Sequence, residues 1–179
     1  LAQLRIVGVA NNVEFLSRLV ATPAFASADL DTGLIERERA LLFPAERETA
    51  PEVWLLAALA ELLRERERRG GPAGAPPSPW DGCDGWRLNH RSTRTLTLRL
   101  GDVQQDVGVE YVPGGYALAL GALRVFASGA FEERGRLLAR IGERRLHAAV
   151  IAAGERRHVF FEGRSYPIVR VDASLGAGE

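Results

Sequence analysis

The sequence predicts an α+β fold in which one long central helix is enclosed by an antiparallel β-barrel of about eight strands, after a short helical segment. Two observations carry this prediction. Residues 51–68 read as a helix with apolar side chains on all sides, and residues 86–172 alternate with the two-residue period of strands. A helix that is apolar all round must be enclosed. A strand meander removes its exposed edges by closing around such a helix, so the barrel satisfies both elements.

Composition limits the classes of partner. The chain has 179 residues with 23 basic and 23 acidic side chains, so its charge favours neither a nucleic acid nor a membrane surface. No apolar run is long enough to span a bilayer. The single cysteine, Cys83, excludes an internal disulfide and fits a reducing compartment. Because the chain begins with Leu1 and contains no methionine, we expect it to be a fragment of a longer protein.

Residues 1–43 contain short elements and no self-contained core. Asn11-Asn12 is a helix-start signal, and apolar residues follow with helical spacing until Pro23 ends the helix. From Phe25 to Glu36 the sequence predicts irregular chain. Since three short elements bury little apolar surface, we expect this segment to lean on another part of the protein.

The long helix begins at a capping signal. Thr49 is a suitable N-cap, Pro51 suits the first turn, and Glu52 completes the Thr-x-x-Glu pattern of a capping box. The helix is apolar on every side from Val53 to Leu63. It then turns polar over Arg64–Arg69, where we expect it to emerge into solvent.

A long loop, residues 70–85, follows the helix; we call it the hook loop. Loops of this length in compact domains are usually functional or linkers. Its prolines restrict the backbone before binding, so less entropy is lost on docking. Aromatic anchors often dominate interfaces, although Trp80 could also fold back over the mouth of the barrel. The residues predicted to contact a partner are Pro76, Pro77, Pro79 and Trp80.

Short strands follow from Trp86 onward. The alternation of polar and apolar residues is clearest over Arg94–Leu100. Each strand keeps one polar face, as expected of a sheet with one face in solvent. Glycine-containing turns are predicted at Pro113-Gly114-Gly115, Gly142-Glu143, Gly154-Glu155 and Glu162-Gly163-Arg164.

No catalytic constellation is evident in the sequence. The histidines His90, His147 and His158 are far apart and lack metal-ligand spacing, so strand or surface positions are favoured over a zinc site. Cys83 has no histidine near it in sequence, which favours an incidental thiol over a nucleophile. The loop carboxylates are interpreted as solvated turn residues rather than an acid–base pair; they are Asp81, Asp84, Asp102 and Asp106.

Three blocks of sequence resemble a known family. The first block is Gly8-Val9-x-x-Asn12-x-x-Phe15-Leu16-x-x-Leu19, then Pro23-x-Phe25, then Asp31-Thr32-Gly33-Leu34-Ile35-Glu36. It resembles the carboxyl end of a biotin carboxylase domain, with Ala10 and Asn11 standing where the family usually has Arg and Thr. The other two are Asp84-Gly85-Trp86-Arg87-Leu88-Asn89 and Val159-Phe160-x-x-Gly163-x-x-Tyr166-x-Ile168-x-x-Val171-Asp172. They resemble the opening and closing strands of the bridging (BT) domain of biotin-containing acyl-CoA carboxylase subunits, the 3-methylcrotonyl-CoA type above all.

The resemblance implies a division of the chain and a role for it. Residues 1–43 would end a biotin carboxylase domain, and residues 44–175 would form the BT domain, a long helix inside a barrel. In that family biotin is carboxylated with ATP and bicarbonate, and the carboxyl group then moves to an acyl-CoA on a carboxyltransferase (beta) subunit. The BT domain joins the two components, and the loop matching residues 70–85 meets the partner subunit. Leu34 and Ile35 would border the adenine pocket.

The same resemblance implies what this fragment should lack. Biotin, ATP and Mg²⁺ would bind to the full-length subunit and not to this fragment, which has no Met-Lys-Met biotinylation motif and is expected to be inactive alone. Its partners would be the carboxyltransferase subunit and its own biotin carboxylase and biotinyl carrier domains. The compartment would be the bacterial cytoplasm or the mitochondrial matrix.

Two alternatives stay open. The chain could play the same part in a carboxylase for propionyl-CoA or geranyl-CoA, because acyl selectivity lies in the transferase. It could instead be a barrel that binds a small ligand in its interior, as lipocalins do, although a helix apolar on all sides would fill that interior.

Overall fold

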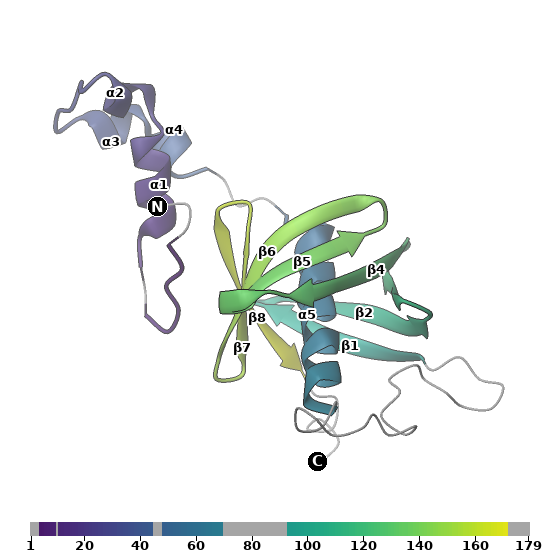
Figure 1. Cartoon of the computed structure of the whole chain (residues 1–179). Coiled ribbons are helices and arrows are strands. Elements are labelled where there is room, and N and C mark those ends of the chain that lie inside the picture. Colours follow the sequence, from purple (N-terminus) through teal and green to yellow (C-terminus); the bar gives the residue numbers. More distant parts are fainter. Residues whose placement is uncertain (1–3, 10, 45–47, 70–92, 172–179) are drawn as a thin grey trace, which may run out of the picture. The chain divides into compact units, whose positions relative to one another are not determined.

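The computed structural model describes residues 4–9, 11–44, 48–69 and 93–171. Contacts divide the chain into two compact units, Leu1–Thr49 and Ala50–Glu179 (Figure 1). The hook loop lies outside the described residues, and with it Pro76, Pro77, Pro79 and Trp80. The expected start of the barrel at Trp86 also falls outside them.

Short helices make up the first unit. They are α1 Val13–Val20, α2 Pro23–Ala26, α3 Leu34–Arg37 and α4 Arg39–Leu42. The prediction of irregular chain from Phe25 to Glu36 is therefore partly wrong. Pro23 begins a new helical turn, because the hydroxyl of Thr22 accepts a hydrogen bond from the backbone N–H of Phe25 at 3.2 Å. Proline fits the first helical position, where its missing N–H would have no partner anyway.

The first unit buries little of its apolar surface. Among its described residues only Thr22, Leu34 and Leu42 are buried, and the ring of Phe15 lies 5.5 Å from that of Phe43, between centroids. Several large apolar side chains stay exposed: Leu4, Val9, Val20, Phe25, Leu30, Ile35, Leu41 and Phe43. The first unit therefore has a small core of its own, as the sequence predicts for three short elements.

The second unit is built around α5, which spans Pro51–Arg69 as the sequence predicts. Every residue from Val53 to Leu63 is buried. The carboxylate of Glu52, which the sequence assigns to a capping box, is hydrogen bonded to the guanidinium of Arg144 on the barrel. None of the described helices is both long and apolar enough to cross a membrane.

Eight antiparallel strands form a closed barrel around α5, so the predicted fold class is confirmed (Figure 1). Neighbours in sequence pair in order, and β1 closes the barrel on β8, with Thr97 opposite Val171. The strands are β1 Thr93–Leu100, β2 Val103–Val112, β3 Gly115–Leu120, β4 Leu123–Phe131, β5 Arg136–Ile141, β6 Arg144–Ala153, β7 Arg156–Phe161 and β8 Arg164–Val171.

Tight hairpin turns join most of these strands at the predicted places. In the turn between β2 and β3, Gly114 has φ +80°, a left-handed conformation that glycine adopts without strain. Gly163 does the same between β7 and β8 with φ +76°. In the turn between β7 and β8 both central residues, Glu162 and Gly163, have positive φ, as in the type I′ turn whose twist suits a two-residue hairpin. The turn between β2 and β3 places Pro113, whose ring fixes φ at about −65°, before Gly114, which is the pattern of a type II turn. A short 3-10 turn, η1 Glu133–Gly135, makes the longer connection from β4 to β5.

Candidate functional site

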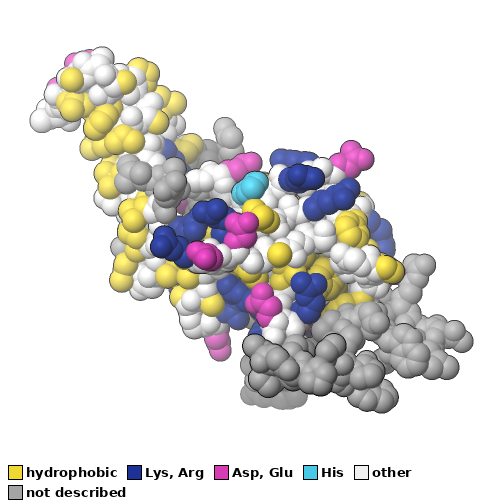
Figure 2. All heavy atoms as spheres, in the orientation of Figure 1, with side chains coloured by type: hydrophobic (Ala, Val, Ile, Leu, Met, Phe, Trp, Pro, Cys, Tyr) yellow, Lys and Arg dark blue, Asp and Glu magenta, His cyan; other side chains and the backbone are white. Residues whose placement is uncertain are grey.

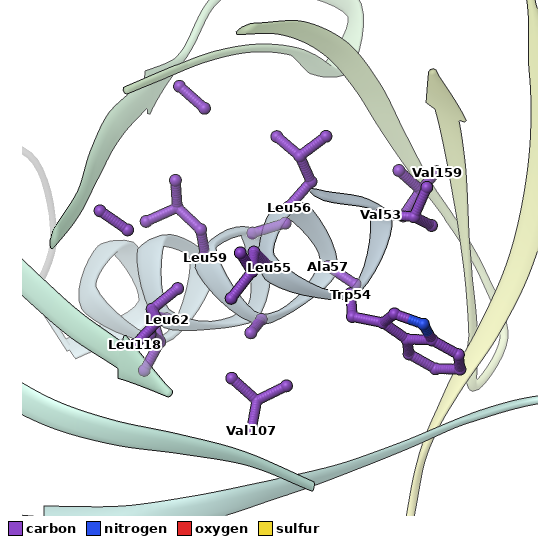
Figure 3. Close-up of a cluster of buried hydrophobic side chains, with 14 of the residues drawn as sticks. Val53, Trp54, Leu55, Leu56, Ala57, Leu59, Leu62, Val107, Leu118 and Val159 are labelled. Atoms are coloured by element: carbon purple, nitrogen blue, oxygen red, sulfur yellow. The ribbon is translucent and has the colours of Figure 1, made fainter. Parts of the chain in front are cut away.

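The interior of the barrel is filled by α5. Leu55, Leu56, Leu59 and Leu62 project from the helix among strand side chains that include Val107, Leu118 and Val159 (Figure 3). Burying a leucine side chain of this kind contributes roughly 1.5–3 kcal/mol. Because the side chains of the helix occupy the interior, the lipocalin-like alternative is not supported.

Ion pairs join the carboxyl-terminal part of α5 to the barrel. The Oε1 atom of Glu61 accepts a hydrogen bond from Nε of Arg157 on β7 at 2.5 Å, and the Glu61 side chain is only 3 % exposed. One turn further, Glu65 accepts hydrogen bonds from Arg170 on β8 at 2.6 Å and from Arg94 on β1. Glu61 and Glu65 are four residues apart and so share one face of the helix. These two carboxylates tie α5 to three strands.

Arg64 makes a different contact at the same end. Its Nη2 donates to the backbone oxygen of Val150 at 2.6 Å, and its guanidinium lies 5.1 Å from the ring centroid of Phe131. The expectation that the whole run Arg64–Arg69 emerges into solvent is therefore wrong for Arg64 and Glu65. They are half-buried because inward-facing arginines and carbonyls of the barrel meet them, whereas the next three residues are exposed.

The ion pairs of Glu65 set its pKa. Burial by itself would raise that pKa, but the hydrogen bonds from Arg94 and Arg170 outweigh burial and hold the pKa below its ordinary value of 4.5. A carboxyl whose pKa is lower in the folded than in the unfolded protein contributes stability above the unfolded pKa. That stability is lost as the pH falls through the folded pKa.

Replacing Glu65 with glutamine is therefore expected to lower the free energy of unfolding at neutral pH by about 1.5–3 kcal/mol, the usual range for hydrogen bonds to charged groups. The gap between parent and variant should close as the pH is lowered from 4.5, because the parent loses the same charge. Denaturant melts at a series of pH values measure this gap. Glu67→Gln, an exposed change on the same helix, serves as control. If the difference in unfolding free energy between the parent and Glu65→Gln stays constant through the acid range, the lowered pKa of Glu65 is wrong.

The described histidines and carboxylates are dispersed over the barrel. No group of three or more histidine, cysteine or acidic side chains in the described part of the chain could hold a metal ion. His147 is exposed on β6, and His158 is half-buried on β7, where burial and then the nearby Arg156 lower its pKa. Asp106 accepts a hydrogen bond from the hydroxyl of Thr97 at 2.7 Å. His90, Cys83, Asp81 and Asp84 lie outside the described residues.

An open hollow of about 550 Å³ lies on the outside of β1–β3. Its floor contains Gly108, Ala117 and Ala119, and Glu110 and Arg124 are charged residues of its lining. No histidine or cysteine is among its lining residues.

Leu34 and Ile35 lie in α3, in different surroundings. Leu34 is buried within the first unit, whereas Ile35 is 46 % exposed. The predicted place of both residues at the rim of an adenine pocket stays a prediction, as does the contact of the hook loop with a partner. Sequence reasoning missed Glu61, Glu65 and the arginines that pair with them.

Comparisons with known proteins agree with this architecture. Residues 50–173 match the family model described as methylcrotonyl-CoA carboxylase, alpha-subunit, BT domain. A mitochondrial methylcrotonoyl-CoA carboxylase subunit alpha from Dictyostelium discoideum is 31% identical over 121 residues, covering 68% of this chain and 17% of that protein. The mitochondrial subunit alpha from Mus musculus is 34% identical over 114 residues, covering 62% of this chain and 16% of that protein. The mitochondrial subunit alpha from Arabidopsis thaliana is 26% identical over 132 residues, covering 64% of this chain and 18% of that protein.

The fold and these matches together place the second unit among carboxylase subunit domains built as a barrel around a helix. The chain belongs to the BT-domain family of methylcrotonyl-CoA carboxylase alpha subunits. It spans about a sixth of the length of the curated relatives it matches. The resemblance to the BT domain noted from the sequence is confirmed. The resemblance of residues 8–36 to the end of a biotin carboxylase domain stays a prediction.

Proposed function

We propose that this chain is the part of a biotin-dependent acyl-CoA carboxylase that holds its biotin carboxylase and carboxyltransferase components together. The main support for this proposal is that the family match and the barrel domain begin and end at nearly the same residues. The family match covers the same residues that form the helix-filled barrel. A rigid domain without a described catalytic cluster suits a connecting role.

The complete subunit would carboxylate biotin with ATP, Mg²⁺ and bicarbonate, and the beta subunit would pass the carboxyl group to the acyl-CoA. The names of the relatives support methylcrotonyl-CoA as the acyl substrate over propionyl-CoA or geranyl-CoA. Biotin would be carried on a separate biotinyl domain.

The first unit fits the end of a biotin carboxylase domain. Its exposed apolar side chains, such as Phe25 and Ile35, would then be covered by the rest of that domain. Of the two residues assigned to the adenine pocket, only Ile35 has a side chain exposed for contact with a ligand. The buried side chain of Leu34 would contribute by packing beneath α3 and holding it in place.

Docking is tested in the full-length alpha subunit. A subunit from which residues 50–171 are deleted is expected to lose its association with the carboxyltransferase subunit while keeping biotin-dependent ATP hydrolysis. Trp80→Ala should localise the contact to the hook loop, because truncating an aromatic anchor typically costs about 2 kcal/mol or more of binding free energy. Sedimentation of the two purified subunits measures both effects, and Trp80→Phe is the matched control.

The thermal midpoint of the alpha subunit separates the two roles of Trp80. Docking predicts an unchanged midpoint for Trp80→Ala, whereas a side chain that closes the barrel mouth predicts a lower one. Normal assembly of the deleted subunit would overturn the proposed function, and normal assembly of Trp80→Ala would remove Trp80 from the interface.

A further inference from the structure

Arginine and carboxylate side chains are unevenly distributed over the barrel. Apart from β2, which carries Asp106 and Glu110, no strand contains an acidic residue, whereas every strand except β2 and β3 contains arginine. Some of these arginines face inward and are neutralised by carboxylates of α5, as Arg157 is by Glu61. Others, such as Arg99 on β1, Arg140 on β5 and Arg145 on β6, are exposed on the outer surface. Basic side chains gather over the hairpin of β5 and β6 in Figure 2.

Two of the outward arginines stand directly opposite each other. Arg140 on β5 is in register with Arg145 on β6. Ala139 and Leu146 beside them are buried in the barrel, so alternation points both arginines outward, where both are exposed. Like charges at opposed positions of an antiparallel pair are destabilising. In the described part of the chain neither arginine forms an ion pair with a carboxylate; Arg140 donates only to the backbone oxygen of Gly142, at 3.2 Å.

An exposed aromatic residue stands on the neighbouring strand. Phe126 on β4 is 37 % exposed, and its backbone oxygen accepts a hydrogen bond from the backbone N–H of Gly142, two residues after Arg140. Its ring leans toward Gly115 on β3, where an added Cβ would come within 2.8 Å of the ring, so the ring lies on the side of β4 away from the arginine pair. Aromatic and arginine side chains together are enriched in protein interfaces.

We propose that Arg140 and Arg145, which form the β5–β6 arginine surface, bind carboxylate side chains on the carboxyltransferase subunit. This inference rests on the docking function proposed above and adds a second contact beside the hook loop. A carboxylate placed between the two guanidinium groups accepts charge-assisted hydrogen bonds from both and removes their repulsion. The strands fix the spacing of the arginine backbones in advance, so the surface needs no rearrangement to bind.

The test is the double variant Arg140→Gln with Arg145→Gln in the full-length alpha subunit. Its association with the carboxyltransferase subunit should be about three- to tenfold weaker, as expected for the loss of two exposed ion pairs. The salt dependence of association should be shallower than in the parent. The thermal midpoint of the unbound subunit should stay the same or rise, because a repulsive pair has been removed.

A matched control removes the same charge elsewhere on the barrel. Arg99 on β1 and Arg156 on β7 are also exposed, and Arg99→Gln with Arg156→Gln should leave association unchanged. Equal weakening by both double variants would overturn the inference in favour of a general charge effect. A normal association constant for the Arg140/Arg145 variant, or a lower thermal midpoint of the unbound subunit, would also overturn it. The two proposals are distinguishable. If deleting residues 50–171 abolishes assembly while the Arg140/Arg145 variant assembles normally, the proposed role of the arginine surface is wrong and the docking function is supported.

Discussion

Leu59→Ala is expected to lower the free energy of unfolding by about 2–5 kcal/mol, the range for deleting a buried leucine side chain. Leu59 is fully buried in the middle of α5, with strands on all sides of it. The cost depends on how far the surroundings collapse into the cavity. A closed barrel is held by continuous backbone ladders and cannot easily close on a vacant space, so we expect the upper part of this range. Denaturant unfolding followed by circular dichroism gives the value.

Leu123→Ala is the matched control, because the same atoms are removed from an exposed side chain at the start of β4. It should change the free energy of unfolding by less than about 0.5 kcal/mol. Leu56→Ala, which also removes a fully buried side chain from α5, should resemble Leu59→Ala. Similar midpoints for the Leu59 and Leu123 variants would mean that the barrel does not enclose the helix.

The elements of the barrel could be predicted because their signals are local. The apolar surface of α5 extends all round the helix within three turns, and each strand shows its alternation within a few residues. The glycine turns then fix which strands are neighbours, since tight hairpins leave antiparallel pairing as the only choice. In the first unit the signal at Thr22-Pro23 was interpreted only as a stop, although the same pair also begins a helix.

The ion pairs of α5 could not be predicted in full, because the sequence indicates which arginines face inward but not which carboxylate of the helix each one meets. Arg94 is in phase with Leu96, and Arg157 is in phase with Val159, so counting by twos places both arginines among the inward-facing residues. That much is readable from the sequence. Which carboxylate each arginine meets depends on the stagger of the barrel and the depth of the helix, which no local pattern fixes. The contact of the hook loop, predicted from its length and prolines and from the family resemblance, stays a prediction, as does the place of Leu34 and Ile35, which rests on the resemblance alone.

Replacing Arg157 with leucine should destabilise the protein by about 3–5 kcal/mol, the usual cost of removing one partner of a buried ion pair. The variant leaves the carboxylate of Glu61 buried against β7 without its counterion. The pair of Glu52 and Arg144 at the other mouth of the barrel offers the comparison, since the Arg144 side chain is 61 % exposed. Arg144→Leu should cost less than about 1 kcal/mol. Denaturant melts at neutral pH measure both.

The double variant Glu61→Leu with Arg157→Leu distinguishes two quantities. One is the net contribution of the ion pair to stability, and the other is the cost of leaving the Glu61 carboxylate buried without a partner. Exchanging a buried ion pair for apolar side chains of similar volume is often neutral or stabilising, so this variant should recover most of the stability that Arg157→Leu loses. The pair would then serve mainly to fix the depth and rotation of α5 within its apolar sleeve, because a helix apolar on all sides has few other features to set them. We therefore expect the near-ultraviolet circular dichroism of Trp54, which is buried on the same helix, to weaken in the double variant even where its unfolding midpoint is restored. A double variant as unstable as Arg157→Leu would instead mean that the ion pair itself stabilises the barrel.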